Sequence, residues 1–183
     1  NSGVVHGGFA YDRGSLKAKL CVEGNKMMGD LAKELDFHFI RCGKVLVGNT
    51  EEDMETLKRT MEQGKDNGAT NLELIDEKRL HELVPAVVGK FAMFSHNSGI
   101  VDPFGYTIAL AENAHANGVE YHFGCEVTAI RREDDDTYEI TTTKGNFKTR
   151  WVVNCAGLGC GKISDMLGIT GYRIIGSKGD YII

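Results

Sequence analysis

The chain is poor in proline and lacks any long apolar run. Only 2 of its 183 residues are proline, whereas 23 are glycine. This composition argues against proline-rich linkers and favours a compact α/β body with many tight turns. No apolar segment approaches the ~20 residues that a membrane-spanning helix needs. The first residues also lack the charged and then apolar layout of a secretion signal.

The chain also has no excess of basic residues and no cysteine pattern typical of a disulfide-bonded fold. The net charge is −5, which gives no electrostatic footprint for nucleic acid. Five cysteines form an odd, scattered set without C-x-x-C spacing, and no histidines stand at metal-ligand spacing. We therefore expect reduced thiols in a cytoplasmic protein, with no metal site and no nucleic-acid partner.

Helix caps are the clearest local signals. Ser15 is expected to cap a helix that runs to about residue 35. Its buried face is predicted from helical spacing to be Leu16, Leu20, Met27, Leu31 and Leu35. Three further helices, each after a capping side chain, are predicted from 50 to about 64, from 76 to 85 and from 102 to about 117.

Alternating apolar residues predict the strands. Residues 37–39 and 44–47 are expected to pair as a hairpin around a turn at Cys42 and Gly43. Further strands are predicted at 72–75, 87–94, 121–127, 138–142 and 147–154, with an acidic hairpin tip at 133–136. The chain finishes in strand-like patterns at 173–175 and 181–183, from which we infer a fragment of a longer protein.

The segment 151–161 carries the strongest chemical signal. A short apolar run there meets a glycine-rich turn, which opens a helix at about residue 162; such a corner lets backbone N–H groups approach a phosphate. Its glycines at 157, 159 and 161 fit a nicotinamide G-x-G-x-x-G fingerprint poorly, and Ile163 stands where a P-loop needs Ser or Thr. A purely connecting turn remains an alternative.

The first eight residues are the second candidate site. His6 stands beside two glycines, so the backbone there could lie along a flat ligand while the imidazole transfers a proton near neutral pH. The alternative is a strand end with a partly exposed histidine. Among basic residues, Arg41, Lys44, Arg173 and Lys178 are each able to bind an anion, although Arg41 and Lys44 are more typical of residues that flank a hairpin turn.

Taken in order, several stretches resemble the D-amino-acid oxidase superfamily of FAD-dependent oxidoreductases. The stretches lie at residues 1–8, 14–24, 98–103, 126–127, 153–158 and 178–181, and their order and separations match along the chain. The resemblance is strongest to bacterial glycerol-3-phosphate dehydrogenases and to L-2-hydroxyglutarate dehydrogenases. It implies a mixed α/β fold, with an incomplete FAD-binding Rossmann-like domain and an antiparallel-sheet substrate domain.

The resemblance also implies roles for individual residues. His6 and Lys178 would face the substrate side of the isoalloxazine ring, with Tyr11 nearby. FAD would be contacted by Asn1, Ser2, Gly3, Val127, Cys155, Ala156, Gly157 and Leu158. Residues 1–34 and 100–168 would belong to the FAD-binding domain, and residues 35–99 and 169–183 to the substrate domain. The opening βαβ unit with its G-x-G-x-x-G turn would precede the chain, so we expect the chain alone to bind FAD weakly or not at all.

The implied reaction is oxidation of a secondary alcohol in a small anionic hydroxy substrate. The segment 103–114 favours glycerol 3-phosphate, which would give dihydroxyacetone phosphate. L-2-Hydroxyglutarate is the alternative substrate, because Ala10 stands where aerobic glycerol-3-phosphate dehydrogenases carry a phosphate-binding arginine. A non-catalytic α/β binding module is a third hypothesis. The electron acceptor stays open, and the resemblance allows peripheral membrane association of the full-length enzyme.

Overall fold

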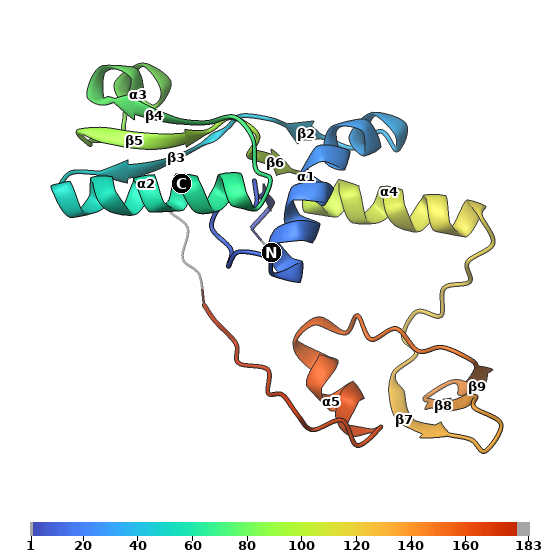
Figure 1. Ribbon diagram of the computed structural model, residues 1–183. Coiled ribbons are helices and arrows are strands. Elements are labelled where there is room, and N and C mark those ends of the chain that lie inside the picture. Colours follow the sequence, from blue (N-terminus) through green and yellow to red (C-terminus); the bar gives the residue numbers. More distant parts are fainter. Residues whose placement is uncertain (1, 179–183) are drawn as a thin grey trace. The chain divides into compact units, whose positions relative to one another are not determined.

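The computed structural model describes residues 2–178, and the described chain divides into two compact units (Figure 1). The first unit ends at Val119 and the second begins at Glu120. Both contain antiparallel sheets and helices, which confirms the predicted mixed α/β fold. The division of the sequence into FAD-binding and substrate segments stays a prediction. Among the described helices, none is long and apolar enough to cross a bilayer.

The first unit holds four helices, each of which begins where a capping side chain was predicted. They are α1 (Leu16–Glu34), α2 (Glu51–Asp66), α3 (Glu77–Leu83) and α4 (Pro103–Ala116). Ser15 accepts a hydrogen bond from the backbone N–H of Ala18 at 3.1 Å. Thr50 and Asp53 form a reciprocal capping box at the start of α2. These bonds satisfy N–H groups that the first helical turn leaves without an intrahelical acceptor.

The main sheet of this unit has the strand order β3-β5-β4 (Lys44–Gly48, Phe91–Ser95 and Leu72–Asp76). Helix α2 covers one face and α3 the other, as Figure 1 shows. Leu46, Met93 and Leu74 stand in one register row and pack on the side of Leu57 in α2. The neighbouring row places Ala92 and Ile75 against Leu80 of α3. Alternation along each strand therefore supplies both halves of the core.

A second, small sheet has the order β1-β6-β2 (Val4–Val5, Gly99–Val101 and Phe39–Ile40). The predicted hairpin between residues 37–39 and 44–47 is therefore wrong, because β2 pairs with β6 whereas β3 pairs with β5. The intervening residues bond to the β5–β6 turn instead of to each other: the N–H of Gly43 donates to the carbonyl of Ser98 at 2.8 Å.

The predicted buried face of α1 is also wrong. Its buried residues are Ala18, Val22, Asn25 and Ala32. Leu16, Leu20 and Met27 are 68%, 55% and 63% exposed. The smaller residues face inward because the loop after β1 packs directly on the helix: the side chain of Phe9 joins Val22 in the core. The close approach of this loop therefore decides which face of α1 is buried, although the opposite face carries larger apolar side chains.

The second unit contains an antiparallel meander, β7-β8-β9 (Val127–Arg132, Tyr138–Thr142 and Gly145–Thr149). The acidic run at 133–136 forms the tip of its first hairpin, as predicted. A 3₁₀ turn, Gly157–Gly159, leads into α5 (Cys160–Asp165).

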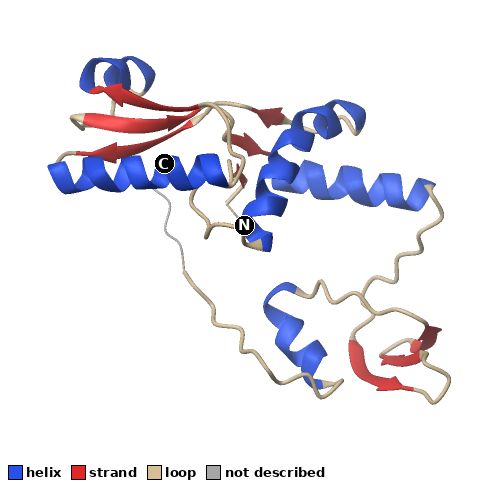
Figure 2. Cartoon of the chain, viewed as in Figure 1, coloured by secondary structure: helices blue, strands red, loops and turns tan. Residues whose placement is uncertain are grey.

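Three predicted strand segments in this unit are loop instead: 121–126, 150–154 and 173–175. The predicted strand at 181–183 lies outside the described residues. Figure 2 shows the loop that joins β9 to the short helix. Trp151 and Val153 are 83% and 82% exposed. Among the described strands, none pairs with residues 150–154. An apolar run gains strand geometry from hydrogen-bonded neighbours, so without them it stays irregular.

A glycine substitution tests the packing of the loop after β1 on α1. Gly8 has a φ of +80°, and a Cβ atom there would lie 2.4 Å from Cγ2 of Val22. We expect Gly8→Ala to lower the free energy of unfolding by about 2 to 4 kcal/mol, through backbone strain and overpacking together. Gly14→Ala is the control, because Gly14 has a φ of +70° but no atom within 4 Å of the added Cβ; its cost should be about 1 kcal/mol. Equal losses in urea unfolding of the full-length protein would show that the contact with Val22 is not tight.

Candidate functional site

A cavity of about 570 Å³ lies in the first unit, beside β1 and α1. The described residues that line it include apolar side chains, a few polar groups and the backbone of 2–6, and none of them is acidic, lysine or arginine. The lining residues are Ser2, Gly3, Val4, Val5, His6, Leu20, Cys21, Gly24, Asn25, Met28, Val101, Pro103, Tyr106 and Thr107. A mostly apolar cavity with a few polar groups is typical of small-molecule sites.

His6 lines this cavity directly after β1, and the residue is only partly buried. Partial burial lowers the pKa of its imidazole, and the positive charges of Lys44 and then Lys17 lower that pKa further. All three effects disfavour the imidazolium ion. The structure therefore provides a histidine that is largely neutral at pH 7 in cationic surroundings, which is the state that a general base requires.

Tyr11 and Cys21 lie next to His6. The rings of His6 and Tyr11 are 6.3 Å apart between centroids, and Nζ of Lys17 is 4.5 Å from the centre of the Tyr11 ring. Burial, followed by the neighbouring Cys21, raises the pKa of Tyr11. Burial also raises the pKa of the Cys21 thiol. Both groups therefore stay protonated at neutral pH and can donate hydrogen bonds, and the Cys21 thiol donates to the carbonyl of His6 at 3.4 Å.

The predicted site residues fall into two sets. Ser2, Gly3 and His6 line one cavity, and Tyr11 is beside it. Val127 begins β7 in the second unit, and the turn 155–158 belongs to that unit as well. Lys178 is exposed in the loop that follows α5, and Asn1 lies outside the described residues. That the two sets meet around one ligand stays a prediction.

The turn at 155–158 is organised by a single asparagine. Nδ2 of Asn154 donates to the carbonyl of Cys160 at 2.8 Å and to Oγ of Ser164 at 3.2 Å, while Oδ1 accepts from the N–H of Ala156 at 3.3 Å. Gly157 follows with a φ of +56°. Leu158 is 82% exposed. The turn therefore has a defined backbone, with its apolar side chain exposed in this unit.

Three residues near His6 escaped the sequence interpretation as functional groups: Lys17, Cys21 and Asn25. Lys17 and Cys21 follow the cap of α1, and nothing in their spacing relates them to His6. Lys44 was named as a possible anion-binding residue, although the flank of a hairpin turn was the favoured interpretation; it begins β3, and its charge acts on His6. Only the fold brings these segments together.

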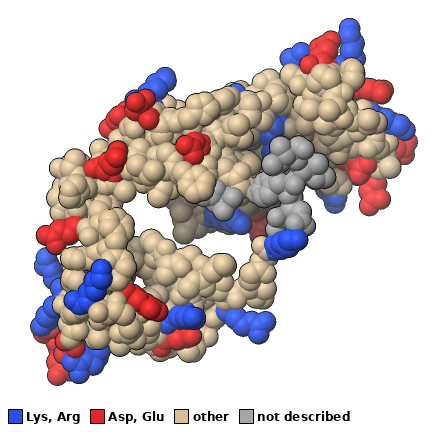
Figure 3. All heavy atoms as spheres, turned by 180° about the vertical axis from the view of Figure 1, so that it is seen from behind, with Lys and Arg blue, Asp and Glu red and all other residues tan. Residues whose placement is uncertain are grey.

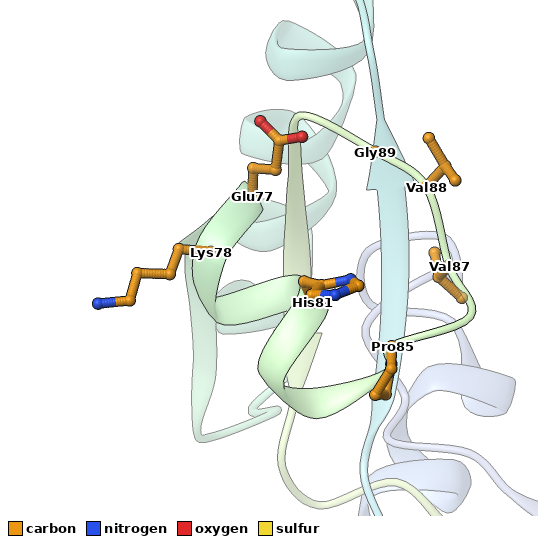
Figure 4. A pocket seen from close by; sticks show the side chains of 7 residues that line it. All are labelled: Glu77, Lys78, His81, Pro85, Val87, Val88 and Gly89. Atoms are coloured by element: carbon orange, nitrogen blue, oxygen red, sulfur yellow. The ribbon is translucent and has the colours of Figure 1, made fainter.

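A second cavity, of about 490 Å³, lies between α3 and the segment 85–89 (Figure 4). The His81 side chain points toward the segment 85–89, while the side chain of Lys78 points away from the cavity. Within the described part of the chain, no three His, Cys, Asp or Glu side chains are grouped so as to hold a metal. On the face drawn in Figure 3, acidic and basic side chains are interspersed. We therefore place the candidate site at the cavity beside His6.

Comparison with known proteins gives the family. The family described as FAD dependent oxidoreductase matches residues 1–183. The chain belongs to this family. The predicted resemblance and the predicted cofactor class, FAD, are thereby confirmed at family level.

Curated relatives of the chain carry two different names. Glycerol 3-phosphate dehydrogenase of Caloramator mitchellensis is 37% identical over 185 residues, which include 100% of this chain and 38% of the relative. Mitochondrial L-2-hydroxyglutarate dehydrogenase of Nematostella vectensis is 32% identical over 197 residues, with 100% and 43% covered. The chain thus spans less than half the length of either relative.

Solved structures share the fold. An L-alpha-glycerophosphate oxidase from Mycoplasma pneumoniae, with FAD bound, superposes with a TM-score of 0.82 at 24% identity, covering 91% of this chain and 45% of the other. L-Proline dehydrogenase from P. horikoshii gives a TM-score of 0.81 at 24% identity, covering 90% and 44%.

The residues at the cavity fit a flavin ring. The described lining has no formal charge apart from the titratable imidazole, presents the backbone of 2–6, and is largely apolar. Largely apolar walls with a few hydrogen-bonding groups suit a flat aromatic ring that carries carbonyl and N–H groups, and a cavity of this size lies in the range of ligand sites. Ser2, Gly3 and His6 are the residues that would contact the ring there.

Titration of His6 tests the electrostatics of the site. We expect its pKa to lie below the ordinary value of 6.5. Lys44→Ala should raise it, because one charge that opposes protonation is gone, and Lys17→Ala should raise it less. Neither variant should restore the ordinary value, since burial is the largest cause. NMR of histidine-labelled full-length protein, assigned with His6→Gln, measures this. Lys58→Ala, whose lysine pairs with Glu55 on α2, is the control, and an unaltered titration in Lys44→Ala would exclude Lys44 as a cause.

Proposed function

We propose that the chain is part of an FAD-dependent dehydrogenase that oxidises the secondary alcohol of a small anionic substrate, glycerol 3-phosphate, to dihydroxyacetone phosphate. One observation supports this most strongly: a histidine with a lowered pKa stands at an uncharged cavity and within the field of two lysines. Family membership supplies the redox class. The arrangement suits a substrate with one end that reacts and another that carries negative charge.

In the proposed reaction, the substrate carbon loses a hydride and its hydroxyl loses a proton, so the alcohol becomes a ketone. When bound, FAD supplies the hydride acceptor. An imidazole nitrogen of His6 accepts the hydroxyl proton, and the low pKa keeps that nitrogen unprotonated before the reaction. Lys17 and Lys44 attract the anionic end, and their charges also favour the partly formed alkoxide.

Tyr11 and Lys178 complete the proposed set. Tyr11 stays protonated and lies beside His6, so its hydroxyl is suited to donate a hydrogen bond to the substrate. Lys178 is proposed as a further anchor for the anion, as the family resemblance implies. FAD is proposed to contact Asn1, Ser2, Gly3, Val127, Cys155, Ala156, Gly157 and Leu158.

Sequence identity favours glycerol 3-phosphate as the substrate, whereas Ala10 favours the alternative. The relative named glycerol 3-phosphate dehydrogenase is 37% identical, compared with 32% for the mitochondrial L-2-hydroxyglutarate dehydrogenase of Nematostella vectensis. Ala10 offers no phosphate-binding cation, and Lys17 and Lys44 are the groups proposed to replace it. Both lysines are also compatible with a dicarboxylate, so L-2-hydroxyglutarate is the alternative substrate. A cytoplasmic location, glycerol metabolism and peripheral membrane association stay predictions.

A substrate screen on the full-length protein tests the proposal. Under anaerobic conditions, we expect glycerol 3-phosphate to bleach the visible absorbance of the flavin. Glycerol is the matched control, because it carries the hydroxyl group without the phosphate, and it should bleach the flavin little. Bleaching by L-2-hydroxyglutarate alone would transfer the assignment to the alternative substrate. A full-length protein that retains no flavin would favour the non-catalytic binding module.

The role of His6 is tested by its removal. A positioned base contributes about two to four orders of magnitude in rate, so His6→Ala should lower the rate of flavin bleaching 10²- to 10⁴-fold. Flavin content should stay that of the parent protein, because bulk and charge change only at the edge of the cavity. His115→Ala, on the last turn of α4, is the control. Unchanged bleaching in His6→Ala would remove the imidazole from the reaction.

A further inference from the structure

The loop that carries His6 is held by side-chain amides as well as by strand pairing. β1 contains only 2 residues and ends at Val5. The carbonyl of His6 accepts hydrogen bonds from Nδ2 of Asn25 at 3.0 Å and from Sγ of Cys21 at 3.4 Å. These two donors are four residues apart on α1 and so lie on one face of the helix. The backbone at His6 is therefore fixed to α1 from the side.

Asn25 joins two distant segments. The other hydrogen of its amide bonds the carbonyl of Asn97, in the β5–β6 turn, at 2.9 Å. Both amide hydrogens are thus used on backbone carbonyls 6 and 97, and the residue is only 5% exposed. A buried amide with both donors engaged has a single favourable orientation, because any rotation leaves polar groups without partners.

Arg41 braces this amide. Its Nη1 donates to Oδ1 of Asn25 at 3.0 Å and to the carbonyl of Asn97 at 2.7 Å, and its Nη2 donates to the carbonyl of Asn25 at 3.1 Å. The guanidinium also lies over the ring of Phe39, 5.4 Å from its centre. A planar fork with several fixed donors makes this set of bonds, which a lysine could not reproduce.

We infer that Asn25, braced by Arg41, is a positioning residue that sets the backbone of His6 and hence the position of its imidazole relative to the substrate. The inference rests on the proposed function of His6. Asn67 provides a similar hold farther along the loop, where its Nδ2 donates to the carbonyls of Gly8 at 3.3 Å and Tyr11 at 2.7 Å. Side-chain amides thus fix both ends of the loop that joins His6 to Tyr11.

A double-mutant cycle in the full-length enzyme tests the inference. The variants are His6→Ala, Asn25→Ala and the two combined, each assayed for kcat and KM with the substrate that bleaches the flavin. Asn25→Ala should lower kcat about 10- to 100-fold, since small displacements of a reacting group cost this much, and should change KM less than about 3-fold, because Lys17 and Lys44 are untouched. In the His6→Ala background, the same change should lower kcat less than about 3-fold.

The outcomes separate this inference from the proposed function. If the two losses multiply in the double variant, Asn25 acts independently of His6 and the inference fails, while the proposed function stands. If His6→Ala alone leaves kcat unchanged, the proposed function fails and the inference fails with it. Lys26→Ala, an exposed neighbour on α1, is the matched control and should keep parental values.

A second variant covers the case in which Asn25→Ala does not fold. Arg41→Gln leaves the buried amide intact and removes only its brace, from an exposed residue. Arg41→Gln should lower kcat by a larger factor than it raises KM. The factor by which it lowers kcat should be smaller in the His6→Ala background. Arg41→Lys should not rescue kcat, because an ammonium group lacks the fork. Parental kcat in Arg41→Gln would overturn the bracing role.

Discussion

The hydrogen bonds of the Asn25 amide are the constraint on which the arrangement of the first unit depends. They join α1, the end of β1 and the turn between β5 and β6, and Arg41 adds the segment between β2 and β3. Four segments that are distant in sequence thereby share one buried polar centre. A buried polar group without all its hydrogen-bond partners costs free energy, and each hydrogen bond has a preferred direction. A complete set of such bonds therefore fixes the relative positions of these segments in a way that apolar packing alone does not.

The same constraint accounts for the electrostatics at His6. Once the loop is fixed on α1, the imidazole lies within the field of Lys17 on that helix and of Lys44 on β3. The whole chain has a net charge of −5, yet this point is locally cationic. The positive potential at His6 comes from the placement of two lysine side chains and not from overall composition. Because both lysines are exposed, their effect should weaken as salt increases.

The local signals in the sequence predicted local structure well. Caps at Ser15, Thr50, Asp76 and Asp102 begin the helices where expected, because a cap acts on backbone groups only a few residues away. Pairing was harder to predict. The hairpin at Cys42 and Gly43 satisfied every local criterion, but a turn near residue 97 supplied competing partners. The buried face of α1 failed for a related reason, since loop 7–9 lies so close to the helix that only its smaller face fits.

For the candidate site as well, the sequence indicated residues through their near neighbours but not through contacts between distant segments. His6 was proposed as a site residue from its glycine neighbours and the family resemblance, and the family was identified from ordered motifs, but neither gives the groups that surround the imidazole. Asn25 bonds the His6 backbone from 19 residues away, and Arg41, between β2 and β3, bonds Asn25 in turn. The proposed general base must be neutral, correctly oriented and close to its anionic substrate. In the proposed site, burial and two lysines keep His6 neutral, the buried amide of Asn25 fixes its backbone, and the same two lysines would attract the anionic substrate. The chemistry of one imidazole therefore depends on residues that carry no chemical signal of their own in the sequence.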